Sequence, residues 1–274
     1  MISPLRFSIV TVCYRQDKYL DDFLQSTNKL ESEKVSLRKV IVVDNYGSCK
    51  DTLEYGSNPD VRIIRSENVG YLRGLGIGVD YACSDDIDFV VVCNPDLKFM
   101  TKIEDDVLQA LRGLWVVAPQ VVDLDGRQQN PNRVSPISIS ELLVWELMAR
   151  SYHCYTALIR LKGIYNDIAI SRRNTLTQQE CEPDGPIFLP HGSCMLMSTD
   201  LLKRADFFNE EIFLWGEEAV IGWTARKVGS GVKYVSSLRI EHASHSSTSN
   251  IPERDKYLIW RNSWRRYRKY LYRK

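Results

Sequence analysis

The sequence predicts an α/β fold in which a mostly parallel sheet is flanked by helices. Short apolar runs rich in valine and isoleucine alternate with segments of helical period along the first 120 residues. Such strand–helix–strand units are joined by right-handed crossovers and therefore give parallel strands. Polar residues lie at or near the ends of three of these runs, at Thr11, Asp44 and Asp96. Because the carboxyl ends of parallel strands meet at one edge of the sheet, the sequence also predicts a ligand crevice there.

The elements of this first part follow one another in regular order. The predicted strands are apolar, β-branched runs: Phe7–Cys13, Lys39–Asp44, Val61–Arg65 and Phe89–Cys93. Predicted helices occupy about 18–30 and 103–114. Between them, a glycine-rich segment at 68–78 leads into a further predicted helix that ends at about 83. The run at 89–93 is apolar at every position, which is typical of a strand that is buried on both faces.

The second part of the chain is less regular. A strand at Trp115–Ala118 precedes a longer-looped region over 127–185, which contains a predicted helix from Ile139 to Arg160. Further predicted elements are a strand over 190–197, a helix over 218–228, a strand over 232–235 and a helix over 254–274. We therefore expect one domain over 1–250, with parts of about 1–120 and 121–250, and a C-terminal helical segment over 251–274.

Charge is distributed unevenly along the chain. Residues 254–274 carry nine lysine and arginine residues and one aspartate, whereas the preceding 253 residues contain 27 basic and 34 acidic residues. An acidic body thus precedes a basic tail. The seven cysteines form no CxxC pair, which favours a reducing compartment over a disulfide framework or a zinc site. With no apolar run near the ~20 residues of a membrane span and no signal-peptide pattern, we expect a cytoplasmic protein.

The segment Asn94-Pro95-Asp96 directly follows the most apolar run. The proline stiffens the backbone and directs Asp96 toward the predicted crevice. A carboxylate in this position can bind a hard divalent cation that carries a diphosphate, and His242, at the end of a later strand, could complete the metal site. Two simpler interpretations stay open, because Asn-Pro-Asp is common in turns and a single histidine often only forms hydrogen bonds.

The stretch from Asn68 to Gly78 contains four glycines and leads into a predicted helix. Glycines let a backbone pass close to a ligand, and a helix N-terminus favours anions. The spacing matches neither the dinucleotide-binding fingerprint nor the P-loop. A flexible loop is the alternative interpretation.

Glu217 and Glu218 begin a predicted helix in the segment Phe213-Leu-Trp-Gly-Glu-Glu218. Glutamates in a first helical turn often do no more than stabilise the helix dipole. The functional interpretation is a general base whose pKa is raised toward neutrality by burial beside Phe213 and Trp215.

Taken in order, these motifs resemble those of the family 2 glycosyltransferases of the GT-A fold, in particular the rhamnosyl- and galactofuranosyl-type transferases of bacterial surface polysaccharide synthesis. The resemblance covers about residues 7–247. It rests on eight short motifs: Val10–Tyr14, Val43–Asn45, Asn68–Gly78, Asn94–Asp96, Gly192–Leu196, Phe208–Glu210, Phe213–Glu218 and His242. It implies a Rossmann-like sheet, with a nucleotide-sugar-binding half over about 1–120 and an acceptor-binding, catalytic half over about 121–250.

The resemblance also implies a role for each matching residue. Thr11 and Asp44 would contact the nucleotide, with Asp44 accepting a hydrogen bond from the base. The remaining nucleotide-sugar-binding residues would be Tyr14, Asn68, Gly70, Tyr71, Arg73, Gly74 and Asn94. Asp96 and His242 would bind a divalent metal, Mn²⁺ or Mg²⁺. Glu218 would be the catalytic base, with Glu217 beside it.

The implied activity is inverting transfer of a sugar from a nucleotide-diphosphate donor, with dTDP-rhamnose as one candidate. The acceptor would be a lipid-linked glycan in O-antigen or capsule synthesis. Several departures from the family pattern leave the donor sugar and the metal requirement open. Asn94 stands in place of the first acidic residue of Asp-x-Asp, and Glu217-Glu218 in place of Glu-Asp or Asp-Asp. Asn209 replaces the aspartate of Phe-Asp-Glu, and Gly76 stands where the glycine loop often carries asparagine. The alternative is a non-catalytic subunit that binds a nucleotide sugar or scaffolds a polysaccharide assembly complex. Arg133 is a further candidate substrate contact.

The C-terminal segment combines aromatic and basic residues at helical spacing. Its apolar stripe consists of Tyr257, Trp260, Trp264, Tyr267 and Leu271, and its other faces carry Arg261, Arg265, Arg268 and Lys269. This composition predicts an interfacial helix on the inner face of an anionic plasma membrane. A terminal helix docked on the domain, with a solvated basic face, is the alternative. No nucleic-acid-binding module is visible, so we expect no nucleic-acid partner.

Overall fold

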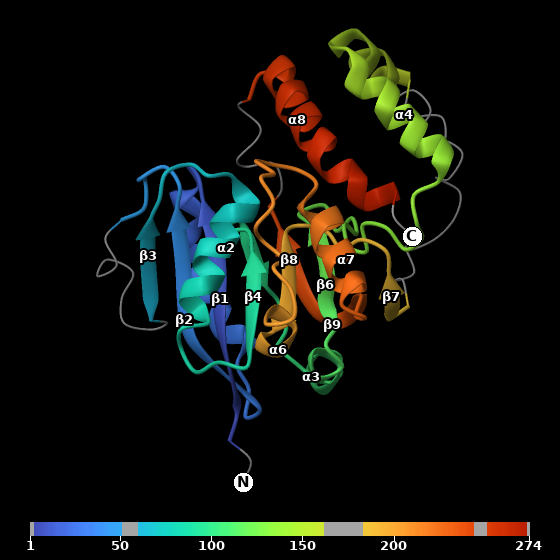
Figure 1. Cartoon of the computed structure of the whole chain (residues 1–274). Helices are drawn as coiled ribbons and strands as arrows, with labels where there is room; N and C mark the ends of the chain where they lie inside the picture. The colour runs from blue at the N-terminus through green and yellow to red at the C-terminus, as the bar shows by residue number, and fades with distance from the viewer. Residues whose placement is uncertain (1–2, 51–59, 162–182, 244–250, 273–274) are drawn as a thin grey trace.

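The computed structural model describes residues 3–50, 60–161, 183–243 and 251–272, and it confirms the predicted α/β fold (Figure 1). The described strands form one curled sheet in the order β3-β2-β1-β4-β8-β6-β9-β5, with β7 paired to β9. The strands are β1 (Leu5–Cys13), β2 (Val35–Asp44), β3 (Val61–Arg65), β4 (Phe89–Cys93), β5 (Leu97–Phe99), β6 (Val116–Asp123), β7 (Gly185–Ile187), β8 (Cys194–Ser198) and β9 (Val232–His242).

The part of the sheet built from the first 93 residues is parallel, as predicted. β1 pairs with β2 and with β4, and β2 pairs with β3. The register aligns Cys13 with Asp44 and Thr11 with Cys93, so these strands end at nearly the same level. β4 is buried at all five positions, which agrees with a strand that is covered on both faces. The loops that follow these strands therefore meet at one edge.

Two short strands that the sequence pattern does not predict complete the far side of the sheet. β5 and β7 have three residues each, which is too short for an alternating pattern to stand out. β5 follows Asp96 directly and runs antiparallel to the end of β9, pairing Leu97 with His242. This register places Asp96 beside His242, although the two are far apart in the sequence.

Helices cover both faces of the sheet and create two apolar cores (Figure 1). The α-helices are α1 (Leu20–Thr27), α2 (Tyr71–Ala82), α3 (Asp105–Arg112), α4 (Ile139–Arg150), α6 (Thr199–Leu202), α7 (Glu217–Lys227) and α8 (Glu253–Tyr272). α1 is flanked by 3₁₀ turns at Asp17–Tyr19 and Asn28–Leu30. α2 and α7 pack on one face of the sheet, and α1 and α3 pack on the other. α8 and α4 lie beyond the carboxyl ends of the parallel strands (Figure 1).

The glycine-rich segment forms part of α2 rather than a loop. The helix begins at Tyr71, directly after Gly70, whose φ of 88° is the left-handed region that favours glycine. A methyl group at Gly78 would lie 2.3 Å from Cγ1 of Val10, and one at Gly74 would lie 3.0 Å from Val12. These glycines therefore let α2 approach β1 closely.

The helix predicted from Ile139 to Arg160 is interrupted at Ser151. Ser138 caps its start in a reciprocal capping box with Glu141, so the predicted first residue is confirmed. Ser151 has an extended backbone, and its hydroxyl accepts a hydrogen bond from the Cys154 N–H. A second helix then occupies 152–161. The break is thus an N-cap, which the uninterrupted apolar pattern conceals.

The apolar stripe of α8 faces the protein and not a membrane. Tyr257, Trp264 and Tyr267 are buried, and Trp264 contacts Trp145 of α4 edge to face. One guanidinium nitrogen of Arg268, Nη1, donates to both carboxylate oxygens of Glu146 of α4.

The remaining predicted membrane residues fall on different sides of α8. Trp260 is half-buried, the Arg261 guanidinium donates to the carbonyl of Ala149, and Arg265 is exposed. The predicted membrane role of the stripe is therefore wrong, and the docked-helix interpretation holds, because α4, α7 and the turn before α7 cover the stripe. Among the described residues, no helix is both long and apolar enough to cross a membrane.

We predict that Gly78→Ala destabilises the protein by about 1–3 kcal/mol, because the added methyl group overpacks the α2–β1 contact. In an unconstrained helix the same change would stabilise the protein by roughly 1 kcal/mol. The free energy of unfolding in urea measures the effect. Gly185→Ala is the matched control, since a methyl group there meets no atom within 4 Å. A Gly78→Ala variant as stable as the wild type would contradict the close approach.

Candidate active site

A cavity of about 560 Å³ opens where the loops that follow the parallel strands meet α2, α7 and the end of β9. We call it the central cavity. Its walls include most of the predicted site residues: Tyr14, Asn68, Gly70, Tyr71, Asn94, Asp96, Glu217, Glu218 and His242. The fold thus brings together residues from widely separated motifs, at the edge of the sheet where the sequence predicted a crevice.

Asp96 and His242 form one polar wall of the central cavity. Each is 6% exposed, and the His242 Nε2 atom lies 3.4 Å from the Asp96 carboxylate. The other ring nitrogen, Nδ1, lies 2.8 Å from Oε1 of Gln129. Because an amide oxygen only accepts, Nδ1 donates to Gln129. Nε2 is the ring nitrogen that faces Asp96, and the Asn94 side-chain amide lies 3.4 Å from it.

This arrangement fits a divalent cation that brings further ligands of its own. One carboxylate and one neutral imidazole nitrogen are suitable donors for Mn²⁺, and Gln129 orients the imidazole from behind. Among the described residues, no three histidine, cysteine or acidic side chains are grouped so that they could hold a metal ion by themselves. A cation at Asp96 and His242 would therefore complete its coordination with oxygen atoms of a bound ligand or of water.

Glu217 and Glu218 also line the central cavity, and a strained turn positions them. Trp215 has a φ of 63° and Gly216 a φ of 106°, so the chain reverses sharply before α7 begins at Glu217. Both carboxylates reach Gly192, where an added methyl group would lie 2.8 Å from Oε1 of Glu218 and 3.0 Å from Oε1 of Glu217. A larger residue at position 192 would therefore displace these carboxylates from their present positions.

The environments of the two glutamates differ. Burial, and then the charge of Glu218, raises the pKa of Glu217 well above its usual range. Its Oε2 atom is buried and has no hydrogen-bond partner among the described residues. Burial also raises the pKa of Glu218, but backbone N–H groups, including those of Gly216 and Gly192, stabilise its charged form. The backbone N–H groups of Glu217 and Trp215 oppose the rise for Glu217, but the added charge of Glu218 makes Glu217 the glutamate whose ionisation is disfavoured more.

The C-terminal helix braces the turn that carries these glutamates. The ring of Tyr267 lies against Gly216, where a methyl group would come within 2.0 Å of it. The Ser263 hydroxyl donates to the carbonyl of Leu214 at 2.6 Å. Further along α8, side chains pair with the acidic residues before the turn: Arg266 with Glu211, and Lys269 and Tyr270 with Glu210. α8 is therefore part of the candidate active site.

A side cavity of about 550 Å³ adjoins the central one and shares Tyr14 and Asn68 with it. Asp44 lines it, but its carboxylate accepts backbone N–H groups from Tyr46, Gly47 and Cys49 at 2.8–3.1 Å. Asp44 thus shapes the turn beside the cavity. The guanidinium of Arg15 lies 4.3 Å from the centre of the Tyr46 ring and extends the aromatic wall.

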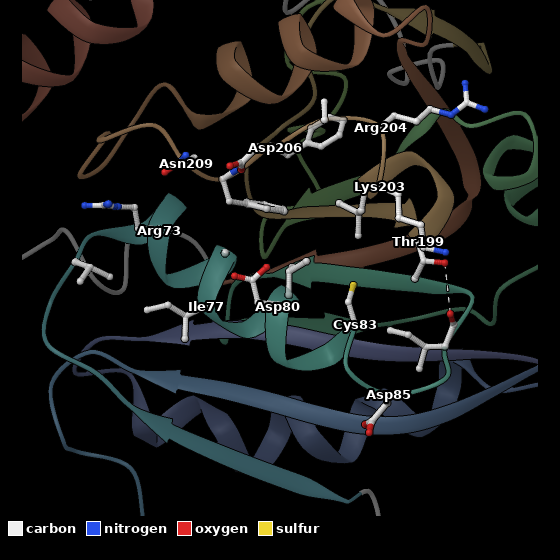
Figure 2. A pocket seen from close by; sticks show the side chains of 18 of the residues that line it. Arg73, Ile77, Asp80, Cys83, Asp85, Thr199, Lys203, Arg204, Asp206 and Asn209 are labelled. Atoms are coloured by element: carbon white, nitrogen blue, oxygen red, sulfur yellow. Dashed lines mark hydrogen bonds between the residues drawn. The ribbon is translucent and has the colours of Figure 1, made fainter.

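Three residues predicted to bind the nucleotide sugar do not reach either cavity. Thr11 is fully buried, and strand alternation directs it to the face of the sheet opposite Val12, which does line the central cavity. Gly74 contacts β1 inside α2. Arg73 lines a larger, outer cavity of about 970 Å³ between α2 and the segment at 199–209 (Figure 2). Because 71–82 is helical, residues 73 and 74 turn away from the site that Tyr71 faces.

Some lining residues carry no distinctive sequence signal. Gln129 and His191 come from the irregular second part of the chain, and Arg15 follows β1 with a left-handed backbone. His191 stacks edge to face on His242 and lies 2.8 Å from the Ser193 hydroxyl. Arg133 pairs with Glu141, whose pKa it lowers to about 2, and therefore has a structural partner away from the site.

No model of a known protein family matches the sequence. It is 22% identical over 224 residues to the low-salt glycan biosynthesis hexosyltransferase Agl10 of Haloferax volcanii, a match that covers 80% of this chain and 61% of the relative. It is 24% identical over 262 residues to the N-acetylglucosaminyl-diphospho-decaprenol L-rhamnosyltransferase of Mycobacterium tuberculosis, covering 89% of this chain and 78% of the relative. Both relatives are glycosyltransferases by name, which confirms the resemblance predicted from the sequence motifs.

Solved structures confirm the GT-A fold. S. aureus TarS 1–349 in complex with UDP superposes with a TM-score of 0.54 and 13% identity, over 86% of this chain and 60% of that one. GalNAc-T7 with UDP, GalNAc and Mn²⁺ superposes with a TM-score of 0.56 and 13% identity, over 98% of this chain and 50% of that one. The chain spans about three fifths of the length of Agl10 and of TarS 1–349, and half that of GalNAc-T7.

We predict that Glu217→Gln makes the protein relatively more stable as the pH rises. A carboxyl group whose pKa is raised in the folded state stabilises that state below its unfolded pKa, near 4.5, and loses this contribution as the pH rises through the folded pKa. The amide that replaces the carboxyl group in the variant does not titrate. Urea unfolding at pH 5.5 and 8.5 should therefore show a larger advantage of the variant at pH 8.5. Glu33→Gln, at an exposed position, is the control and should follow the wild type. Parallel pH profiles would rule out a protonated Glu217.

Proposed function

We propose that the chain is an inverting glycosyltransferase that moves a sugar from a nucleoside diphosphate to a hydroxyl group of a glycan. The observation that carries this proposal is that a candidate cation site and a buried carboxylate pair line the same cavity. Asp96 and His242 suit a cation bound to a diphosphate. Glu217 and Glu218 suit proton removal near neutral pH, because burial raises their pKa values. The GT-A fold and the hexosyltransferase and rhamnosyltransferase relatives support the same activity.

In this mechanism Glu218 accepts the proton of the acceptor hydroxyl group. At the same time the oxygen atom of that hydroxyl group attacks the anomeric carbon of the donor sugar. The bond from that carbon to the diphosphate breaks on the opposite side, so the configuration inverts. Glu217 keeps its own proton and leaves Glu218 as the single anion of the pair. A divalent cation at Asp96 and His242 would neutralise the charge that develops on the departing diphosphate. Tyr14 and Asn68, which line both the central and the side cavity, would contact the donor between its base and its diphosphate.

We propose a deoxysugar donor such as dTDP-rhamnose and a lipid-linked glycan acceptor, as in O-antigen or capsule assembly. Support comes from the mycobacterial relative, whose name gives rhamnose as the sugar and a diphospho-decaprenol as the acceptor. A lipid-linked acceptor would bring the reaction to the cytoplasmic surface of a membrane. The buried aromatic residues of α8 take no part in that contact.

We expect Glu218→Gln to lower the rate of sugar transfer by roughly 10²–10⁴-fold, because the isosteric amide cannot accept the hydroxyl proton. Donor binding, measured by calorimetry, should stay unchanged. The assay follows release of the nucleoside diphosphate in the presence of acceptor, and Glu33→Gln is the matched control. A Glu218→Gln variant with wild-type turnover would refute the base assignment. If Glu217→Gln were the inactive one, the base would be Glu217.

We expect Asp96→Asn to abolish the joint stabilisation of the protein by Mn²⁺ and a nucleoside diphosphate. In the wild type the two ligands together should raise the melting temperature more than the sum of their separate effects, because each completes the site of the other. Thermal shifts with Mn²⁺, dTDP and UDP, alone and combined, measure this. Asp125→Asn, at an exposed position, should behave as the wild type. Additive shifts in the wild type would show that the diphosphate binds without a cation at Asp96.

A further inference from the structure

A separate cavity of about 320 Å³ lies between α4, the helix at 152–161, the start of α7 and α8. Five of its twelve lining residues are aromatic: Trp145, Tyr155, Trp215, Trp260 and Tyr267. Glu218 and Trp215 line both this aromatic cavity and the central cavity. The two cavities therefore meet at the carboxylate to which the mechanism assigns the acceptor proton.

We propose that the aromatic cavity binds the acceptor, and that its ligand is a sugar ring attached to phosphate. This inference rests on the proposed function, because it is the transfer reaction that requires a second substrate at Glu218. The cavity is smaller than the central one and borders the side of Glu218 that faces α8. A ring held here would place its hydroxyl groups next to Glu218, the carboxylate that the two cavities share.

The chemistry of the wall favours a sugar over a purely apolar ligand. The apolar face of a pyranose packs on aromatic rings, while its hydroxyl groups need polar partners at the edges. Trp145, Tyr155 and Trp260 are only partly buried, so they retain ring surface for such a contact. Asn132 and Glu218 supply polar atoms at the edge.

The aromatic wall is rigid before any ligand binds. Trp264 is fully buried and contacts Trp145, Trp260 and Tyr267 at ring-centre distances of 5.3–6.2 Å. The Tyr155 ring lies 5.5 Å from that of Trp260. A preformed wall loses little conformational freedom on binding, which favours affinity.

Lys256 indicates the phosphate. Lys256 is the single lysine or arginine among the described residues that line the aromatic cavity. Its side chain is 23% exposed. Its ammonium group lies 2.8 Å from Glu253, a carboxylate that is itself 69% exposed and therefore screened by solvent. A phosphate linked to the sugar would compete for the ammonium group with more charge than that carboxylate.

The test is calorimetric binding of N-acetylglucosaminyl diphosphate esterified with a short alkyl chain, in the presence and absence of dTDP. We expect the wild type to bind this probe and Trp260→Ala to bind it at least about tenfold more weakly, with Trp260→Phe in between. Lys256→Gln should bind several-fold more weakly. Leu258→Ala, an exposed position on the same helix, is the matched control and should bind as the wild type.

Binding of dTDP separates failure of the acceptor site from failure of the proposed function. Together with the melting temperature, it shows whether Trp260→Ala is folded and keeps its central cavity. A wild type that binds dTDP but not the probe, or a folded Trp260→Ala with unchanged probe affinity, would overturn the acceptor site and leave the transferase proposal standing. Unchanged binding by Lys256→Gln would overturn the phosphate assignment. A wild type that binds neither ligand would count against the proposed function itself.

Discussion

The contact between Tyr267 and Gly216 is the constraint on which the candidate site depends. The backbone before α7 must reverse through two left-handed residues, Trp215 and Gly216, to present both glutamates to the cavity. Such a turn costs conformational energy and persists only when its surroundings hold it. Tyr267 closes over the glycine, and Ser263 holds the carbonyl just before the turn. The last helix of the chain thus positions carboxylates that lie some 50 residues earlier.

Two adjacent glutamates can have different roles because their surroundings raise their pKa values for different reasons. Burial raises both, but the charge of Glu218 adds to the rise for Glu217. Backbone N–H groups oppose the rise in both, yet one oxygen atom of Glu217 has no partner among the described residues. Glu217 is therefore the glutamate whose charged form is disfavoured more. Glu218 is also the one that borders both the central and the aromatic cavity.

The parts of the fold that could be predicted from the sequence are those that depend on local pattern. β4 is predicted to the residue, because a run that is apolar at every position has one interpretation in an α/β protein. Thr11 and Arg73 are misplaced by sequence reasoning because motif order does not determine the direction of a side chain. The membrane role assigned to the α8 stripe is wrong for a related reason. An aromatic stripe has the same appearance in the sequence whether lipid or another helix covers it.

Because Asn94 is uncharged, Asp96 is the single carboxylate that the end of β4 offers to a cation. A second acidic residue there would strengthen binding of the cation alone. The amide instead lies 3.4 Å from Nε2 of His242 and adds no charge to the site. With only one negative side chain, most of the charge that attracts the cation would come from the diphosphate of the donor. Cation and donor would then bind together, and the site would lose its cation when the nucleoside diphosphate leaves. One carboxylate is sufficient under this arrangement because the substrate supplies the other negative charges.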